Sequence, residues 1–202
     1  MSIADHDVET TSTVQPGTES GATTSGSEAH DVVIVGAGPV GLVAALRLAS
    51  FGVASVVLDA KPHHVKQGSK ACLIHGDVLD ILDAVGCADV IDAEGVTWSM
   101  ARTYVRNREI RAHQFERPIG YGPFVNISQH RIEQVLLEAV EASPLTEVRW
   151  GVRVDALAQD AQGVELAITD GGGGGDDAGG RRSTVHAGHV LACDGEIGRA
   201  HV

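Results

Sequence analysis

The stretch that most constrains the fold is residues 31–61, DVVIVGAGPVGLVAALRLASFGVASVVLDAK. It opens with a short apolar run rich in β-branched residues, which is typical of a buried parallel strand. A G-x-G-x-x-G sequence follows at residues 36–41, and residues 42–49 then have the almost wholly apolar pattern of a buried helix. A second apolar strand is predicted at residues 53–58, and Asp59 follows it directly. This order, within about 30 residues, predicts a βαβ unit.

The residues at the turn of this unit predict a dinucleotide site. Gly36 allows the tight turn, Gly38 lets a pyrophosphate approach the backbone, and Gly41 lets helix and strand pack closely. Pro39 lies within this turn, and the N–H groups and partial positive charge at the start of the helix that follows favour phosphate. Asp59 comes about 18 residues after Gly41, close to the spacing at which a carboxylate reaches an adenosine ribose. We therefore expect all five residues to contribute to cofactor binding.

The same stretch could have a purely structural role or a role in a membrane. The glycines could serve packing alone, but the ordered strand, helix and acid around them favour a ligand. The stretch could instead span a membrane, because residues 32–46 carry no charge. That run is only about 15 residues long and contains Pro39 and three glycines, whereas about 20 apolar residues are needed. A membrane span is therefore rejected.

Bulk properties narrow the class of protein. The chain has 202 residues, which is enough for one domain with a real core or slightly more. Its net charge of −12 argues against nucleic acid and anionic membranes as partners. No signal-peptide pattern begins the chain, and three cysteines without a C-x-x-C motif suit a cytoplasmic protein. The ten histidines are scattered along the sequence, so we expect no metal site.

The first half of the remaining chain mixes loops and helices. Residues 1–30 are rich in Ser, Thr, Gly and acids, and we expect a disordered tail. Residues 62–70 have the composition of a polar loop, and residues 75–85 have helical spacing with Gly86 able to cap the end. Aromatic and charged residues interleave over residues 96–121, with a hairpin expected around Asn107. This segment is predicted to leave the nucleotide-binding fold.

The second half is predicted to return to it. Ser128 is placed to N-cap a helix that runs to about residue 142, with an apolar face toward the core. The glycine-rich residues 171–180 are expected to form a flexible hairpin tip. Asp194 follows the last strand. Extended segments are predicted at residues 124–127, 147–155, 164–169 and 189–193.

Four blocks of the chain, taken in order, resemble a known family. They are the glycine unit with Asp59, residues 68–71 leading into a helix, residues 124–136 with Gln129 followed by Glu133, and residues 191–195 with an Asp-Gly pair. Residues 31–195 are thus similar to the N-terminal half of the flavoprotein aromatic monooxygenases, the group of p-hydroxybenzoate and phenol hydroxylases. Residues 96–111 resemble members that act on phenols and hydroxyphenylpropionates.

The resemblance implies a Rossmann-like α/β FAD-binding fold with a parallel sheet plus a β-meander. It implies FAD as cofactor, NAD(P)H as electron donor, and O₂-dependent hydroxylation of a small phenolic or other aromatic substrate. It also aligns Lys70, Gln129 and Asp194 with residues that contact FAD. Family members usually have Arg where this chain has Lys70, and Lys lacks the planar guanidinium. From the residues alone, Gln129 could instead cap its helix and Asp194 could start a turn.

The resemblance also suggests how the chain is divided. The later Gly-Asp block of the family and most of its substrate sheet have no counterpart here, so the chain looks like an incomplete N-terminal half that is inactive alone. The sequence leaves the catalytic residues and the oligomeric state undefined. Alternatives are another FAD-dependent oxidoreductase on this scaffold, such as a halogenase or a reductase, and an inactive nucleotide-binding fragment. The expected segments are a tail at 1–30, FAD-binding parts at 31–95 and 128–195, a substrate-domain excursion at 96–127, and a non-native terminus at 196–202.

The non-native terminus is expected because of its coding sequence. Residues 197–202 can be encoded as ATC GGA AGA GCA CAC GTC, which is the start of a common short-read library adapter whose next triplet is a stop. The family's Asp-Gly block usually continues with Ser and Arg, and this chain departs from that pattern after Gly195. We therefore expect the native part of this chain to end at Gly195 and residues 197–202 to have no function.

Overall fold

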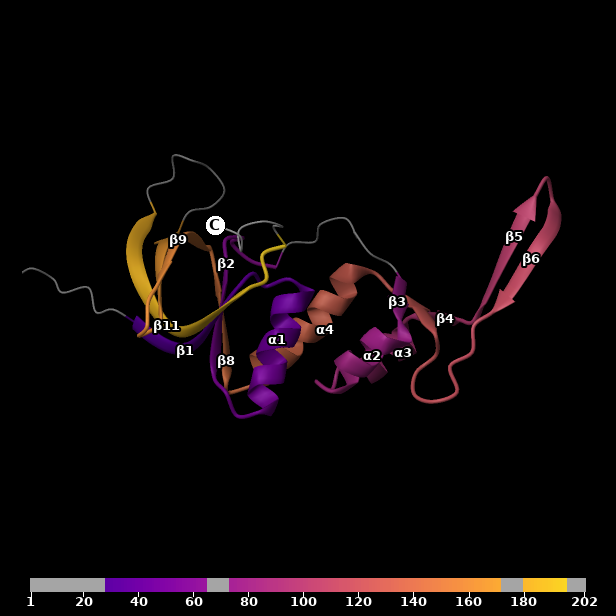
Figure 1. The fold of residues 1–202 in the computed structure, drawn as a ribbon, viewed down its shortest axis with the longest axis horizontal. Helices are drawn as coiled ribbons and strands as arrows, with labels where there is room; N and C mark the ends of the chain where they lie inside the picture. The colour runs from indigo at the N-terminus through magenta and orange to yellow at the C-terminus, as the bar shows by residue number, and fades with distance from the viewer. Residues whose placement is uncertain (1–27, 65–72, 172–179, 196–202) are drawn as a thin grey trace, which may run out of the picture.

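The main sheet organises the molecule (Figure 1). The structure is a computed structural model, and it describes residues 28–64, 73–171 and 180–195. Six strands lie in the order β8-β2-β1-β11-β10-β9. Neighbours from β8 to β11 are parallel, and β11, β10 and β9 form an antiparallel meander, which confirms the predicted fold class. The strands are β1 (Glu28–Val35), β2 (Ser55–Asp59), β8 (Thr146–Trp150), β9 (Val152–Gln159), β10 (Val164–Asp170) and β11 (Arg181–Ala192).

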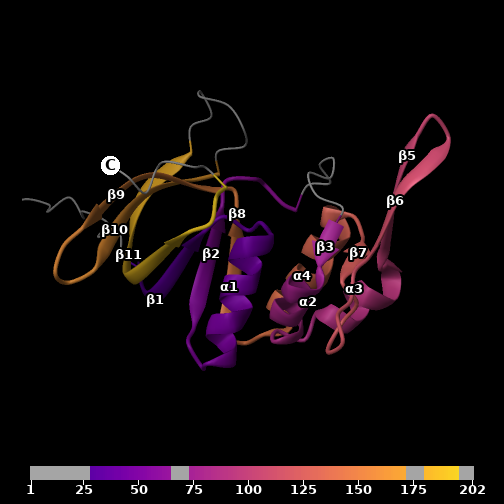
Figure 2. The same cartoon turned by 45° about the vertical axis from the view of Figure 1, so that its right-hand side comes forward.

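The central strands are buried on both faces, so alternate residues enter two different cores. Ile34 and Val57 belong to the core on the helical side, together with helices α1 (Pro39–Ser50) and α4 (Gln129–Ala142). Val33, Val56 and Leu58 face the other way, into a core shared with the meander. Figure 2 shows α1 lying along the sheet with α4 beside it. This double burial explains why β1 and β2 are continuous apolar runs.

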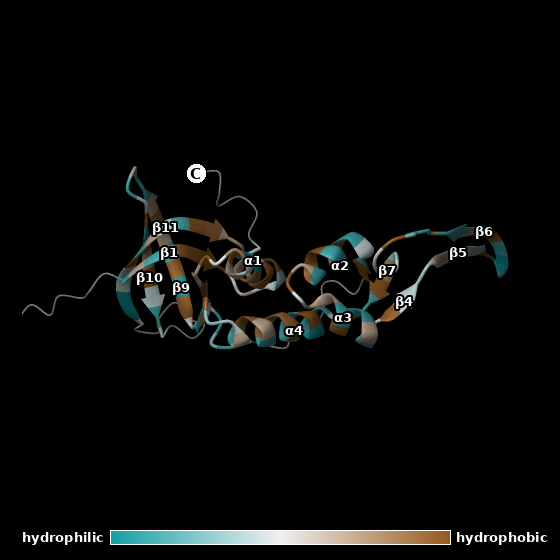
Figure 3. Cartoon of the chain, turned by 90° about the horizontal axis from the view of Figure 1, so that it is seen from below, coloured by the Kyte–Doolittle hydropathy of each residue, from teal (hydrophilic) through white to brown (hydrophobic). Residues whose placement is uncertain are grey.

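The rest of the described chain extends away from the main sheet. A small antiparallel sheet, in the order β3-β7-β4, packs with two short helices. Beyond it the β5–β6 hairpin projects outward, and its tip is hydrophilic (Figure 3). Arg106 and Asn107 turn the hairpin with φ of 47° and 62°, which confirms the turn predicted around Asn107. The elements are β3 (Leu73–His75), α2 (Gly76–Asp83), α3 (Ala88–Glu94), β4 (Val96–Trp98), β5 (Met100–Val105), β6 (Arg108–Gln114) and β7 (Phe124–Asn126).

Helix α4 begins as the sequence predicts. The Ser128 side chain accepts a hydrogen bond from the Arg131 N–H at 3.3 Å, which caps the first turn. The buried face carries apolar residues at helical spacing, which is the predicted arrangement. None of the helices within the described residues is both long and apolar enough to cross a bilayer. The buried residues of α4 are Ile132, Val135, Leu136 and Val140.

Several predicted boundaries were wrong. β1 begins at Glu28 inside the expected tail, because Glu28 already pairs in parallel with Val185 of β11. The single strand predicted at residues 147–155 is two strands, since Gly151 lies between β8 and β9 with φ of +73°. β11 begins at Arg181 rather than residue 189. The expected hairpin tip lies largely outside the described residues, although its flanking strands are antiparallel neighbours.

Candidate dinucleotide site

The ends of three parallel strands meet at one edge of the main sheet. The Gly36 N–H, just after β1, donates to the Leu58 carbonyl of β2 at 2.7 Å. The Cys193 N–H, just after β11, donates to the Val35 carbonyl at 2.7 Å. Gly36, Asp59 and Asp194 therefore lie at the carboxyl edge of the sheet, where open α/β sheets bind their ligands.

The three glycines of the turn have different structural roles. Gly36 has φ of +104°, and a Cβ atom there would lie 2.5 Å from the Cys193 carbonyl oxygen. A Cβ atom on Gly41 would lie 1.9 Å from the Gly36 carbonyl oxygen. Gly38 has φ of −79°, and a Cβ atom there would meet nothing within 4 Å. The fold needs Gly36 and Gly41, whereas the space over Gly38 is an open cradle of the kind a pyrophosphate occupies.

The start of α1 favours a negatively charged group in the open space over Gly38. Gly38 is the N-cap residue and provides no side-chain cap, and Pro39 occupies the start of the first turn. That turn carries no acidic residue. The N–H groups at a helix start lack intrahelical acceptors and carry partial positive charge. The turn is therefore suited to an anionic group, and the residues present fit a dinucleotide pyrophosphate.

Asp59 is buried at the end of β2 and connects two loops. Its Oδ2 accepts the Ala37 N–H at 2.8 Å, and its Oδ1 accepts the Lys61 N–H at 2.8 Å. The side chain thus holds the glycine turn against the loop after β2. A carboxylate offers about four acceptor positions, so two remain for ribose hydroxyls. The backbone role of Asp59 was not predicted from the sequence.

The other predicted residues are placed less centrally. Gln129 is the first residue of α4, and its Nε2 donates to Glu133 Oε1 at 2.8 Å. Asp194 is exposed and follows β11, so close to the turn that a Cβ atom on Gly36 would lie 2.8 Å from its Cα. Lys70 lies outside the described residues. The structure therefore brings Asp194 to the glycine turn, and it places Gln129 on the helix that packs beside α1.

The Cys193 side chain lies beside the glycine turn. Burial raises the pKa of Cys193, and the neighbouring Asp194 carboxylate raises it further. A thiol with a raised pKa is a poor nucleophile at neutral pH. Cys193 therefore contributes packing, with its Cβ 3.4 Å from the position a Cβ on Gly41 would take.

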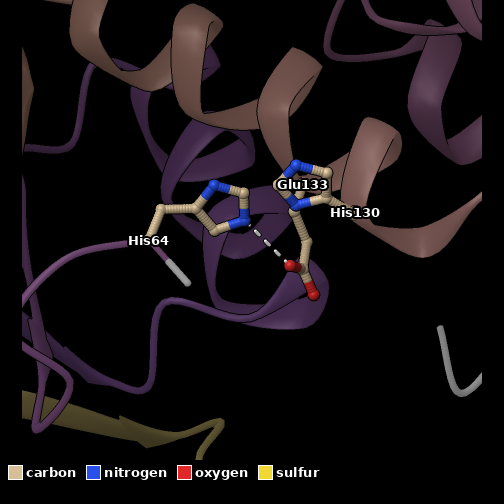
Figure 4. A group of neighbouring side chains, drawn as sticks. All are labelled: His64, His130 and Glu133. Atoms are coloured by element: carbon tan, nitrogen blue, oxygen red, sulfur yellow. Dashed lines mark hydrogen bonds and ion pairs between the residues drawn. The ribbon is translucent and has the colours of Figure 1, made fainter. Parts of the chain in front are cut away.

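Figure 4 shows a second group of residues, whose proximity was not predicted from the sequence. His64, in the loop after β2, pairs through Nε2 with Glu133 Oε2 at 3.0 Å. The His64 and His130 rings stack with centroids 4.8 Å apart and an interplanar angle of 11°. The expectation of no metal site rested on the scatter of histidines along the sequence. The fold brings these three side chains together across 69 positions of chain, which no local spacing rule detects.

The fold and site define a dinucleotide-binding protein of the Rossmann-like class. The family model described as "FAD binding domain" matches residues 29–201, so the chain belongs to the FAD binding domain family. It is 30% identical over 171 residues to a 3-(3-hydroxy-phenyl)propionate/3-hydroxycinnamic acid hydroxylase of Mycolicibacterium smegmatis, covering 83% of this chain and 28% of that protein. It is 31% identical over 168 residues to a pentachlorophenol 4-monooxygenase of Sphingobium chlorophenolicum, covering 81% and 29%.

Solved structures agree with this assignment. The p-nitrophenol 4-monooxygenase of Pseudomonas putida superposes with a TM-score of 0.74 at 25% identity, covering 86% of this chain and 43% of that one. The flavin-dependent monooxygenase PieE, solved with FAD and substrate, superposes with a TM-score of 0.69 at 26% identity, covering 85% and 31%. The chain spans less than a third of the length of the two curated relatives.

Proposed function

We propose that this chain binds FAD at the β1–α1 turn and forms the FAD-binding part of a monooxygenase. The observation that carries the proposal is the open cradle over Gly38, between an uncapped helix start and the buried carboxylate of Asp59. In the proposal, backbone N–H groups at the start of α1 hold the pyrophosphate and Asp59 accepts the adenosine ribose hydroxyls. Lys70, Gln129 and Asp194 make further contacts to the cofactor.

The proposed activity is the hydroxylation of a phenolic or other aromatic substrate with O₂, with NAD(P)H as the electron donor. It is supported by the names of the relatives, which include hydroxylases and monooxygenases of phenols. FAD, when bound, supplies the redox chemistry, and the protein supplies binding, orientation and exclusion of water. We propose further that residues 96–127, which include the projecting β5–β6 hairpin, belong to the substrate domain.

A glycine exchange tests the cofactor site. Gly38→Ala places a methyl group in the cradle without a steric or conformational cost to the free protein. We expect the Kd for FAD, measured by flavin fluorescence on the purified 202-residue chain, to rise at least about tenfold because the phosphate approach is blocked. The midpoint of urea unfolding without FAD should not fall.

The matched control is Gly122→Ala, at another glycine with open space around its Cβ position but away from the turn. This variant should bind FAD like the unsubstituted chain. Equal FAD affinity of Gly38→Ala and the unsubstituted chain would overturn the proposed pyrophosphate position. Absence of saturable FAD binding by the unsubstituted chain would overturn the proposal itself.

A further inference from the structure

The cluster of His64, His130 and Glu133 has the composition of a metal site. Each residue offers one donor atom, and the three donor atoms all lie within 4.8 Å of one another. Two come from the first turns of α4, and His64 comes from the loop after β2 (Figure 4). All three side chains are partly buried, so an ion there would lose only part of its water.

The distances suit a small divalent ion after a modest adjustment. Donor atoms that bind one zinc ion at about 2.0–2.2 Å lie about 3.0–3.5 Å apart. His64 Nε2 and Glu133 Oε2 are already 3.0 Å apart. The stacked rings are nearly parallel, so one imidazole must rotate about its Cβ–Cγ bond for both histidines to face the same ion. His64 lies in a loop, which makes such a rearrangement easier than between two helices.

Two features around the cluster favour metal binding by these three residues. Gln129 Nε2 donates to Glu133 Oε1 at 2.8 Å, which orients the carboxylate and leaves Oε2 directed at His64. The Nδ1 atom of His130 is buried and has no hydrogen-bond partner among the described residues. A buried polar atom without a partner is costly, and a ligand in this position would remove the cost. The chain's net charge of −12 also favours a cation.

We propose that His64, His130 and Glu133 bind one divalent transition-metal ion of the Zn²⁺ class. Two imidazoles and one carboxylate form a donor set typical of borderline ions, and a fourth position stays open to water. Hard ions such as Mg²⁺ prefer oxygen ligands and are excluded by the two histidines. The ion links the loop after Asp59 to the start of α4. It does so without any contribution from the glycine turn, and its one connection to the proposed FAD contacts is Gln129, which orients Glu133.

Titration of the purified 202-residue chain with Co²⁺ and Zn²⁺ tests the proposal. We expect one Co²⁺ per chain, visible-region d–d absorption of a site with nitrogen and oxygen ligands, and no thiolate charge-transfer band. Zn²⁺ should displace Co²⁺ and raise the midpoint of thermal unfolding. His64→Ala, His130→Ala and Glu133→Gln should each weaken Zn²⁺ binding at least about tenfold. Circular dichroism verifies that each variant is folded.

The control is His63→Ala, which removes the exposed neighbouring histidine of the same loop. It should bind Zn²⁺ with the affinity of the unsubstituted chain. Equal loss in His63→Ala and His64→Ala would show adventitious binding by loop histidines and overturn the site. A thiolate band, or affinity unchanged in all three ligand variants, would overturn it as well. Because the metal titrations are done without FAD, a negative result would not contradict the proposed FAD site.

Discussion

Asp59 shows how one residue can hold the fold and a ligand at the same time. Its two carboxylate oxygens accept the N–H groups of Ala37 and Lys61, each at 2.8 Å, while the side chain is buried. Asp59→Asn keeps the shape but replaces one acceptor with an NH₂ group that faces a backbone donor. We expect the free energy of unfolding to fall by about 1–3 kcal/mol, because one buried N–H loses its partner. Urea unfolding of the chain without FAD measures this loss.

Asp170→Asn is the control for this exchange, because Asp170 also ends a strand but is exposed. Its unfolding midpoint should stay within experimental error of the unsubstituted chain. Equal stability of Asp59→Asn and Asp170→Asn would contradict the structural role of Asp59.

At the residue scale, the sequence predicted some roles and could not predict others. The roles of the glycines follow from a spacing rule, and the structure gives Gly36 and Gly41 the close contacts that this rule requires. The backbone contacts of Asp59 depend on how the glycine turn approaches β2. The pairing of His64 with Glu133 depends on the packing of a loop against α4, far away in the sequence. Neither contact leaves a local pattern.

At the element scale, Gly151 explains why the single strand predicted at residues 147–155 is two strands. Apolar residues alternate at positions 148, 150, 152 and 154, so the period of two continues through the break. Gly151 has φ of +73°, and there the chain leaves the parallel sheet and enters the meander. Its N–H donates to the Lys61 carbonyl at 2.7 Å. The alternation predicted the extended conformation correctly but could not reveal the change of partner strand, from β2 for β8 to β10 for β9.

Gly151→Ala tests whether the positive φ matters for stability. A Cβ atom there would meet nothing within 4 Å, so the cost is purely conformational. A left-handed conformation costs an L-residue about 1–2 kcal/mol, and the free energy of unfolding should fall by that amount. Gly122→Ala, in open space and without a positive φ, should leave stability unchanged or raise it slightly. Chemical denaturation of both variants gives the comparison, and equal effects would contradict a conformational role for Gly151.

Elements with strong periodic patterns were predicted well, whereas the short elements α3, β3 and β4 were not predicted. The β1–α1–β2 unit and α4 have long apolar patterns with clear start signals, and both are present. Helix α3 has only seven residues and no capping side chain, so its sequence carries little signal. β3 and β4 have three residues each and exist because they pair with β7.

At the scale of the whole molecule, arginine–carboxylate contacts at the surface connect elements that lie far apart in the sequence. Arg149 of β8 reaches past β2 to Glu28 at the start of β1. Arg131 of α4 holds Glu94 of α3 through two hydrogen bonds, at 2.6 and 2.8 Å. Each contact favours the ionised carboxylate. Hydrogen bonds lower the pKa of four carboxyl groups: Glu28 and Glu147 through Arg149, Glu94 through Arg131, and Asp155 through Thr169 and Arg153.

These contacts predict how stability depends on pH. Because the pKa of each group is lower in the folded chain, the unfolded chain binds more protons in acid. Their contribution is complete above the ordinary glutamate pKa of 4.5 and is lost as pH falls through and below that value. The midpoint of urea unfolding should therefore fall between about pH 5 and pH 3. Arg149→Gln should lower the midpoint at neutral pH and flatten this fall, because Glu28 and Glu147 lose the donor that lowers their pKa. Arg108→Gln, on the exposed β6 strand, should keep the original slope, and a slope unchanged by Arg149→Gln would contradict the assignment.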